Sequence, residues 1–232
     1  MNTSLIIFLL IGQSNMSGRG PMDAVHPLQH AHVQMFRQGE WTKAKEPLHT
    51  DQPAAAGIGL GMSFAVEIAR QNPSFTVGLV PCAVGSSLLD SWMPGSPNYV
   101  AAVATTREAM KSGKLGGILW HQGEQDALSA TDSATYAARL AVMVETLRKD
   151  LNAPNVPFIA GELGAFLKDH PGCKDNFGTV NEQLRSLLGQ VPGYRLVTVD
   201  GLIDKGDHTH FSSPALRELG KRYAKEFSKK EP

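Results

Sequence analysis

The chain has 232 residues, of which 42% are hydrophobic and 19% charged, a composition that excludes a largely disordered protein and predicts one with a large core. Lys and Arg together number 22, as do Asp and Glu, so the formal net charge is zero. We therefore expect no nucleic-acid or membrane partner, and instead a small molecule or a polysaccharide. The two cysteines, Cys82 and Cys173, are too few for a disulfide framework, and the sequence does not predict an oligomeric state.

The chain opens with an apolar run over residues 5–11. Seven residues are too few to span a membrane, and the run lacks the positive region and the cleavage site of a secretory signal. We therefore predict a buried first strand. Localisation stays open between the cytoplasm and secretion with the signal already removed.

Strand-like and helix-like segments alternate through the rest of the chain. Short apolar runs rich in β-branched and aromatic residues predict four more buried strands, over 76–81, 115–120, 157–161 and 194–199. Apolar residues at helical spacing predict helices over 59–70, 99–111, 135–150, 177–188 and 214–228. This alternation predicts one α/β domain over residues 1–232, with a five-stranded parallel sheet and helices on both faces. Residues 21–52 do not follow this alternation of strands and helices, and we expect a small hairpin there, beside the sheet.

Polar clusters follow four of the predicted strands, at residues 12–18, 82–87, 121–126 and 207–211. Ligands of open parallel sheets bind beyond the carboxyl ends of the strands, so these loops predict a common site. Ser14 is the candidate nucleophile, in a turn that Gly12 and Gly18 allow to be tight. The turn differs from the Gly-x-Ser-x-Gly elbow, because Met16 stands where that motif has glycine.

His210 is the candidate general base and Asp207 its carboxylate partner. Since Asp207 lies only three positions before His210 in one loop, the carboxylate can fold back onto Nδ1 and leave Nε2 facing Ser14. Glu124 is the alternative partner of His210, or else a residue that orients the loops. The spacing in the loop favours Asp207.

The oxyanion of an acyl transfer needs hydrogen-bond donors. The candidates are the backbone amides of Ser14 and Gly85 and the side-chain amide of Gln122. Three further residues near the predicted site are candidates for contacts with the substrate: Gln13, Asn15 and Trp92.

Three motifs together resemble those of a known family: Gly-Gln-Ser-Asn-Met at 12–16, His-Gln-Gly-Glu at 121–124 and Asp-x-x-His-Phe at 207–211. They resemble the SGNH hydrolases, and more closely carbohydrate esterase family 6 and the sialate O-acetylesterase-like group. The resemblance runs from residue 5 to about residue 223. It implies a flavodoxin-like three-layer α/β/α fold and cofactor-free hydrolysis of acetyl esters on carbohydrates, most often acetylated xylan. It also implies the same roles for Ser14, His210, Asp207, Gly85 and Gln122, while Glu124 has been considered as the acid in this branch.

Other functions are less well supported by the sequence. A metal-dependent hydrolase would use histidines and carboxylates such as His121, Glu124 and Asp126, but these lack the spacing of known metal ligands, and we expect no metal. A non-catalytic carbohydrate-binding module could stack sugars on tryptophan, but it has no use for an activated serine. Within the esterases, lipase-like and thioesterase SGNH enzymes usually carry Gly-Asp-Ser where this chain has Gly-Gln-Ser. Which sugar carries the acetyl group, xylan, sialic acid or another, depends on loops 21–52 and 88–98.

Overall fold

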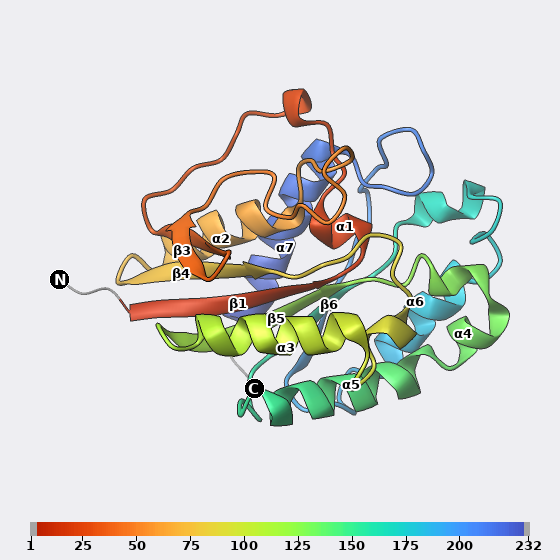
Figure 1. Ribbon diagram of the computed structural model, residues 1–232. Helices are drawn as coiled ribbons and strands as arrows, with labels where there is room; N and C mark the ends of the chain where they lie inside the picture. Colours follow the sequence, from red (N-terminus) through yellow and green to blue (C-terminus); the bar gives the residue numbers. More distant parts are fainter. Residues whose placement is uncertain (1–3, 230–232) are drawn as a thin grey trace.

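A single seven-stranded sheet organises residues 4–229, which are the residues that the computed structural model describes (Figure 1). The strand order is β3-β2-β4-β1-β5-β6-β7, and every pairing is parallel except that of β2 with β3. The strands are β1 (Ser4–Gly12), β2 (Val33–Arg37), β3 (Glu40–Lys43), β4 (Phe75–Pro81), β5 (Lys114–His121), β6 (Phe158–Gly161) and β7 (Tyr194–Val197).

Helices cover both faces of the sheet. In the view of Figure 1, α2 (Leu60–Gln71) and α7 (Ser213–Ser228) lie above it, and α3 (Pro97–Ala109) and α5 (Tyr136–Asp150) lie below, with α6 (Phe177–Ser186) packed on α5. The short elements are α1 (Ser14–Ser17), α4 (Ala130–Ala134), η1 (Met22–Ala24), η2 (Leu89–Trp92), η3 (Asp126–Leu128) and η4 (Ala165–Asp169). No helix within residues 4–229 is long and apolar enough to cross a membrane.

The five strands predicted from apolar runs are present as β1, β4, β5, β6 and β7, in the spatial order 2-1-3-4-5 of flavodoxin-like folds. The predicted count of five is wrong, because the hairpin β2–β3 joins the sheet instead of lying beside it. β2 pairs with β4 through only three residues, and all four residues of β3 are at least partly exposed. The expected hairpin within residues 21–52 is thus present, but its place is different. Neither strand carries a continuous apolar run, so the pattern that reveals buried strands does not show that they belong to the sheet.

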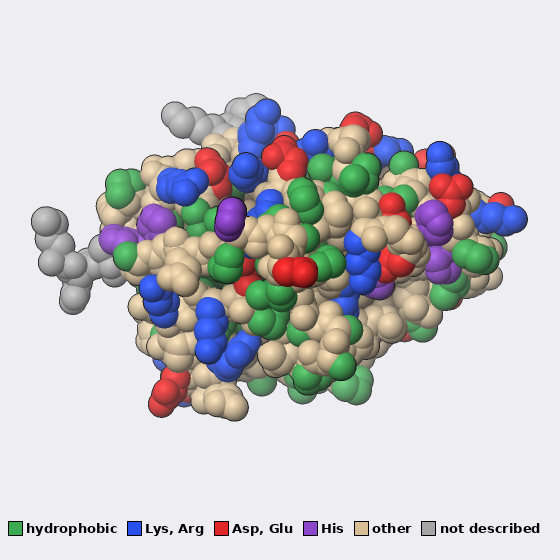
Figure 2. All heavy atoms as spheres, turned by 90° about the horizontal axis from the view of Figure 1, so that it is seen from above, with side chains coloured by type: hydrophobic (Ala, Val, Ile, Leu, Met, Phe, Trp, Pro, Cys, Tyr) green, Lys and Arg blue, Asp and Glu red, His purple; other side chains and the backbone are tan. Residues whose placement is uncertain are grey.

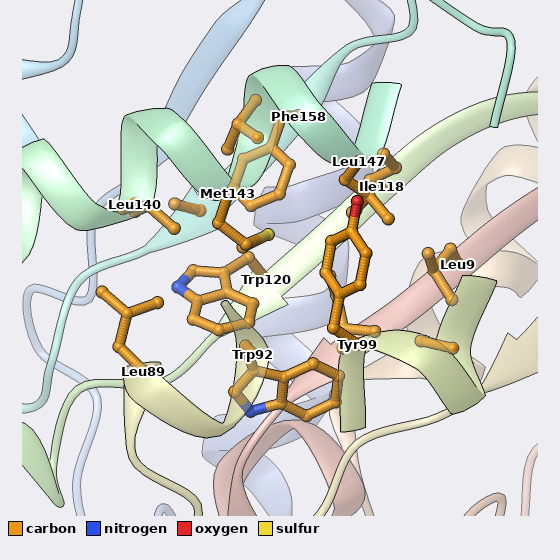
Figure 3. Packing of buried hydrophobic residues seen from close by; sticks show 14 of the residues in the cluster. Leu9, Leu89, Trp92, Tyr99, Ile118, Trp120, Leu140, Met143, Leu147 and Phe158 are labelled. Atoms are coloured by element: carbon orange, nitrogen blue, oxygen red, sulfur yellow. The ribbon is translucent and has the colours of Figure 1, made fainter. Parts of the chain in front are cut away.

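The central strand β1 shows why the buried strands read as continuous apolar runs. Ile7, Leu9 and Ile11 pack into the core on one face of the sheet, whereas Phe8 and Leu10 pack into the core on the other. Successive strand residues point to opposite faces, so a strand covered on both sides must be apolar at every position. The core below the sheet contains the larger aromatic group, including Trp92, Trp120 and Tyr99 (Figure 3).

Charges are mixed on the molecular surface. Figure 2 shows Lys, Arg, Asp and Glu side chains interspersed over the upper face, with apolar and uncharged polar surface between them. Closely mixed charges of both signs cancel over short distances, so this face presents no extended field to a charged ligand.

The exit of β1 is fixed by a close approach to β5. Gly12 has φ of +131°, and a Cβ atom there would lie 2.1 Å from the carbonyl oxygen of His121. Only glycine fits this position, because a side chain would collide with the neighbouring backbone. The chain therefore turns immediately after β1 and presents Ser14 at the carboxyl edge, between the ends of β4 and β5.

Candidate active site

The nucleophile turn, residues 12–18, holds Ser14 at the first position of α1. The Gln13 amide donates to the His121 carbonyl at 2.9 Å, and the Gly18 amide donates to the Ser14 carbonyl at 2.8 Å. These bonds attach the turn to the end of β5 and close it on itself. Ser14 is buried except for a small exposed fraction of 5%.

A loop from the other end of the chain places an imidazole over this serine. We call residues 204–211 the His210 loop. Nε2 of His210 lies 3.0 Å from Oγ of Ser14, and Nδ1 of His210 lies 2.7 Å from Oδ2 of Asp207. The second oxygen of Asp207 accepts from the backbone amides of Thr209 and His210, which folds the loop back on the carboxylate. Ser14, His210 and Asp207 therefore form a continuous hydrogen-bonded series.

The environment sets the charges of this series. Burial disfavours the imidazolium and lowers the pKa of His210 below its ordinary value, although the Asp207 carboxylate opposes this shift. Burial opposes ionisation of Asp207, but hydrogen bonds from the His210 ring and from the loop amides outweigh it and lower the pKa of Asp207 to about 2. A neutral imidazole that donates from Nδ1 to a carboxylate keeps Nε2 free to accept the serine proton.

Gln122 occupies a different place from the one predicted. Its side chain is fully buried, and Nε2 already donates to the Gln13 side chain, the Ser87 carbonyl and the Asp126 carboxylate. Its carbonyl oxygen accepts from the Tyr136 hydroxyl at 2.8 Å. In this geometry the side-chain N–H groups of Gln122 bond to protein acceptors that join three loops, so the role of Gln122 as an oxyanion donor stays a prediction.

The Gly85 amide is also engaged, but at the surface of the site. It donates to Oδ2 of Asp51 at 2.7 Å, and the same oxygen pairs with Arg19 at 2.7 Å. A Cβ atom at position 85 would lie 2.5 Å from the Arg19 guanidinium, so this packing requires glycine. The sequence analysis missed Arg19 and Asp51, and no signal marks them, since they are 32 residues apart and Asp51 lies in an irregular segment.

The three predicted substrate contacts all face inward, Gln13 and Trp92 among them. Trp92 is 1% exposed, donates from its indole to the Ser87 hydroxyl and packs edge-to-face on Trp120 at 5.7 Å (Figure 3). Its predicted role in substrate binding is wrong, because η2 turns it into the core below the sheet. Gln13 is buried as well, and its Oε1 accepts from the amides of Gly123 and Gln125.

Asn15, the third predicted substrate contact, is 1% exposed and also faces inward. Its amide bonds to Glu124, to the Thr209 carbonyl and to the Phe211 amide. Since these bonds use both ends of the amide, the predicted contact with the substrate is not present in this geometry.

Glu124 is buried and makes no hydrogen bond or ion pair with His210. Its Oε1 accepts from the Asn15 amide, while Oε2 has no hydrogen-bond partner. Burial raises the pKa of Glu124 to about 7, against the opposing effect of the Asn15 hydrogen bond. The structure thus brings Asp207, and not Glu124, to the imidazole. Within residues 4–229, no three His, Cys, Asp or Glu side chains are grouped as ligands of a metal ion.

Comparison with known proteins identifies the family. A family model described as "carbohydrate esterase, sialic acid-specific acetylesterase" matches residues 4–229. The chain belongs to this family. A probable carbohydrate esterase of Arabidopsis thaliana is 32% identical over 235 residues, which cover 92% of this chain and 86% of the relative. This carbohydrate esterase is accordingly a carboxylic ester hydrolase, and its family membership indicates that it is a carbohydrate acetylesterase.

Solved structures share the fold of this carbohydrate esterase. The X-ray structure of an Arabidopsis thaliana protein matches with a TM-score of 0.87 at 30% identity, covering 96% of this chain and 97% of that one. NanS matches with a TM-score of 0.77 at 18% identity, over 97% of both chains. The acetylxylan esterase Axe2 of Geobacillus stearothermophilus matches with a TM-score of 0.58 at 10% identity, over 98% of this chain and 95% of that one. The last two likenesses concern the fold alone.

Proposed function

We propose that this carbohydrate esterase removes O-acetyl groups from sugars through a Ser14–His210–Asp207 triad and an acetyl-enzyme intermediate. One observation carries the proposal: the His210 ring bridges the Ser14 hydroxyl and the Asp207 carboxylate, at 3.0 and 2.7 Å. A serine hydroxyl is a weak nucleophile by itself, and a neutral imidazole held by a carboxylate supplies the base that it needs.

In the proposed reaction, His210 removes the Ser14 proton through Nε2 while the serine oxygen attacks the acetyl carbonyl carbon. The protonated His210 then gives this proton to the sugar oxygen as its bond to the acetyl carbon breaks, so the sugar leaves as an alcohol. Water attacks the acetyl-enzyme by the same route and releases acetate.

The oxyanion donors in this proposal are backbone amides. The Ser14 amide is the first donor, and the Gly85 amide is the second once Asp51 has released it. Replacement of a carboxylate by the developing oxyanion at Gly85 exchanges one negative acceptor for another, so the amide keeps a strong hydrogen bond.

Two substrate classes are supported by different observations. The zero net charge favours a neutral acetylated polysaccharide such as acetylxylan, the substrate named for Axe2. The description of the family model favours an O-acetylated sialic acid. Both substrates present the same acetyl ester to Ser14, so the proposed chemistry does not depend on the choice between them.

Hydrolysis of a chromogenic acetate ester by wild type and by Ser14→Ala tests the mechanism. We expect Ser14→Ala to lower kcat by at least about 1000-fold, since loss of a triad nucleophile leaves only binding and oxyanion stabilisation. Ser17→Ala is the matched control, because Ser17 lies in the same short helix and its hydroxyl bonds only to the Ser14 carbonyl. Near wild-type turnover by Ser14→Ala contradicts the proposal. Release of acetate from acetylxylan and from an O-acetylated sialic acid then separates the two substrates.

A further inference from the structure

The neighbours of Ser14 each hold one loop of the site. Asn15 donates to the Thr209 carbonyl at 3.0 Å and accepts from the Phe211 amide at 3.0 Å, so its amide group bonds the backbone on both sides of His210. Since Asn15 directly follows Ser14, these bonds fix the position of the His210 loop relative to the nucleophile.

Gln13 does the same for the second loop, residues 122–126, which we call the Glu124 loop. Its Oε1 accepts from the amides of Gly123 at 3.3 Å and Gln125 at 3.2 Å, on both sides of Glu124. The Cys173 thiol donates to the Glu124 carbonyl at 3.3 Å and fixes the same residue from a third direction. The backbone is thus hydrogen-bonded on both sides of Glu124, as it is on both sides of His210.

One hydrogen bond, from Nδ2 of Asn15 to Oε1 of Glu124, connects the two loops. It joins the Glu124 loop to the side chain that holds the His210 loop. This bond uses the second N–H of the amide, whose first N–H goes to Thr209. The Thr209 carbonyl can only accept, and Oε1 of Glu124 accepts beside it, so these two oxygens determine which end of the Asn15 amide carries nitrogen. An amide rotated by half a turn would place its oxygen against two other oxygens, and its nitrogen against the Phe211 amide.

We infer that Asn15 and Glu124 are positioning residues of the proposed reaction, with Glu124 acting on His210 through the Asn15 amide. This inference rests on the proposed function. In this arrangement Glu124 orients Asn15, Asn15 holds Thr209 and Phe211, and these two hold His210 at hydrogen-bond distance from Ser14.

The surroundings of Glu124 support a functional reason for its presence. Its side chain is 4% exposed, Oε2 has no partner, and no Lys, Arg or His of the described residues lies within ion-pair distance. Burial of a carboxyl group with one oxygen unsatisfied opposes folding. A group kept in spite of such a cost is typical of a functional site, and the bond to Asn15 is what its side chain provides here.

The first experiment compares Glu124→Ala with Glu124→Gln in the full chain, using a chromogenic acetate ester. Glu124→Gln keeps a carbonyl oxygen for the Asn15 amide, so we expect kcat within about threefold of wild type. Glu124→Ala removes the acceptor, and we expect kcat to fall about 10- to 100-fold with KM little changed, because small misplacements of a reacting group carry losses of this size. Gln125→Ala is the matched control, since that side chain makes no hydrogen bond and only the backbone of Gln125 is used.

The pH profile separates positioning from a direct role as the acid. If Glu124 acts only through Asn15, the acidic limb of kcat/KM lies at the same pH in Glu124→Gln as in wild type. If Glu124 is the carboxylate partner of His210, Glu124→Gln loses as much activity as Glu124→Ala and its acidic limb moves. The second result overturns the inference.

A double variant tests the contact itself. Asn15→Asp places a carboxylate against Glu124 and the Thr209 carbonyl, so we expect a loss of more than about 100-fold. In Asn15→Asp combined with Glu124→Gln, the new side-chain amide can donate to the new carboxylate, and we expect at least tenfold recovery over Asn15→Asp. A double variant no better than Asn15→Asp overturns the inference, and so does Glu124→Ala with wild-type kcat.

Two readouts keep these outcomes distinct from failure of the proposed function. Ser14→Ala measured in parallel shows whether hydrolysis depends on Ser14 at all; if it does not, the proposed function fails. If hydrolysis depends on Ser14 and Glu124→Ala matches wild type, only the positioning inference fails. Activities are divided by the folded fraction measured by circular dichroism. If Glu124→Ala does not fold, the positioning inference is tested by Glu124→Gln and the double variant.

Discussion

Nε2 of His210 lies 3.0 Å from Oγ of Ser14, although 196 residues separate the two in the chain. Ser14 follows the central strand β1, and His210 precedes α7, which packs against α2 on the upper face of the sheet. The contact therefore depends on the whole sheet, because only the assembled strand order brings the two carboxyl-edge loops together.

The acidity of His210 predicts the pH dependence of hydrolysis. Only the neutral imidazole accepts the Ser14 proton, so kcat/KM falls as the pH falls through the pKa of His210. Burial lowers that pKa, and we expect the midpoint of the acidic limb below the ordinary value of 6.5. Asp207→Asn removes the carboxylate that raises the pKa, so its midpoint moves to still lower pH, and kcat falls by about 1000-fold or more.

The measurement is kcat/KM of a chromogenic acetate ester from about pH 4 to 9, at constant ionic strength. Asp204→Asn is the control, since Asp204 lies in the same loop but bonds only to loop amides and approaches His208 rather than His210. A wild-type midpoint above 6.5, or a limb that Asp207→Asn leaves in place, contradicts this account.

The burial of Gln122 predicts a loss of stability rather than a selective loss of catalysis. Gln122→Ala leaves the Asp126 carboxylate, the Ser87 carbonyl and the Tyr136 hydroxyl each without one partner. We expect the free energy of unfolding to fall by about 3 kcal/mol, because buried polar groups left unsatisfied cost about 1–3 kcal/mol each. Urea denaturation measures it, and Gln190→Ala, at an exposed position, is the control.

An unchanged free energy of unfolding in Gln122→Ala, together with a large fall in kcat, would restore the role of oxyanion donor that the sequence predicted. The structure gives the opposite expectation, since the hydrogen bonds of the Gln122 amide all go to other protein groups.

The position of Trp92 predicts a similar outcome for a different reason. Trp92→Ala removes a large side chain from the core below the sheet, where it packs on Trp120 (Figure 3). We expect a loss of about 3–5 kcal/mol, as is usual for large aromatic residues replaced by alanine in a core. Leu88→Ala, nearby and partly exposed, should change stability by less than about 1 kcal/mol. A stable Trp92→Ala protein with only a raised KM would show a substrate contact instead.

The Arg19–Asp51 pair predicts a third stability effect. Both side chains are largely buried, so Asp51→Ala leaves an uncompensated guanidinium, and we expect a loss of about 3 kcal/mol. Burial opposes ionisation of Asp51, but hydrogen bonds from Arg19 and the Gly85 amide outweigh it and hold the pKa of Asp51 below its ordinary value. The pair therefore stabilises the fold above the ordinary pKa, and this stabilisation is lost as the pH falls through the lowered one.

Thermal unfolding of wild type and Asp51→Ala from about pH 3 to 7 measures this effect. Asp23→Ala is the control, since Asp23 is exposed and makes no hydrogen bond or ion pair. The difference between wild type and Asp51→Ala should shrink toward acidic pH. A difference that stays constant with pH would show that packing, and not the charge of Asp51, accounts for the loss.

The sequence determined the frame of this protein because the frame depends on local periodicity. Apolar runs marked the strands β1, β4, β5, β6 and β7, and helical spacing marked the five longer helices. The hairpin β2–β3 was expected as well, but its place in the sheet was not, since its polar and partly exposed residues show no apolar run that indicates pairing with β4.

The tertiary structure alone decided what the polar residues at the carboxyl edge do. The sequence placed Gln13, Asn15 and Gln122 near Ser14, but an amide beside a nucleophile can face the substrate or the protein. Packing turned all three inward, where each bonds to groups from distant loops, whereas Asp207 and His210 share one loop whose spacing already specified their contact. The direction in which such a side chain points depends on hydrogen-bond partners far away in the chain, and local sequence patterns do not reveal those partners.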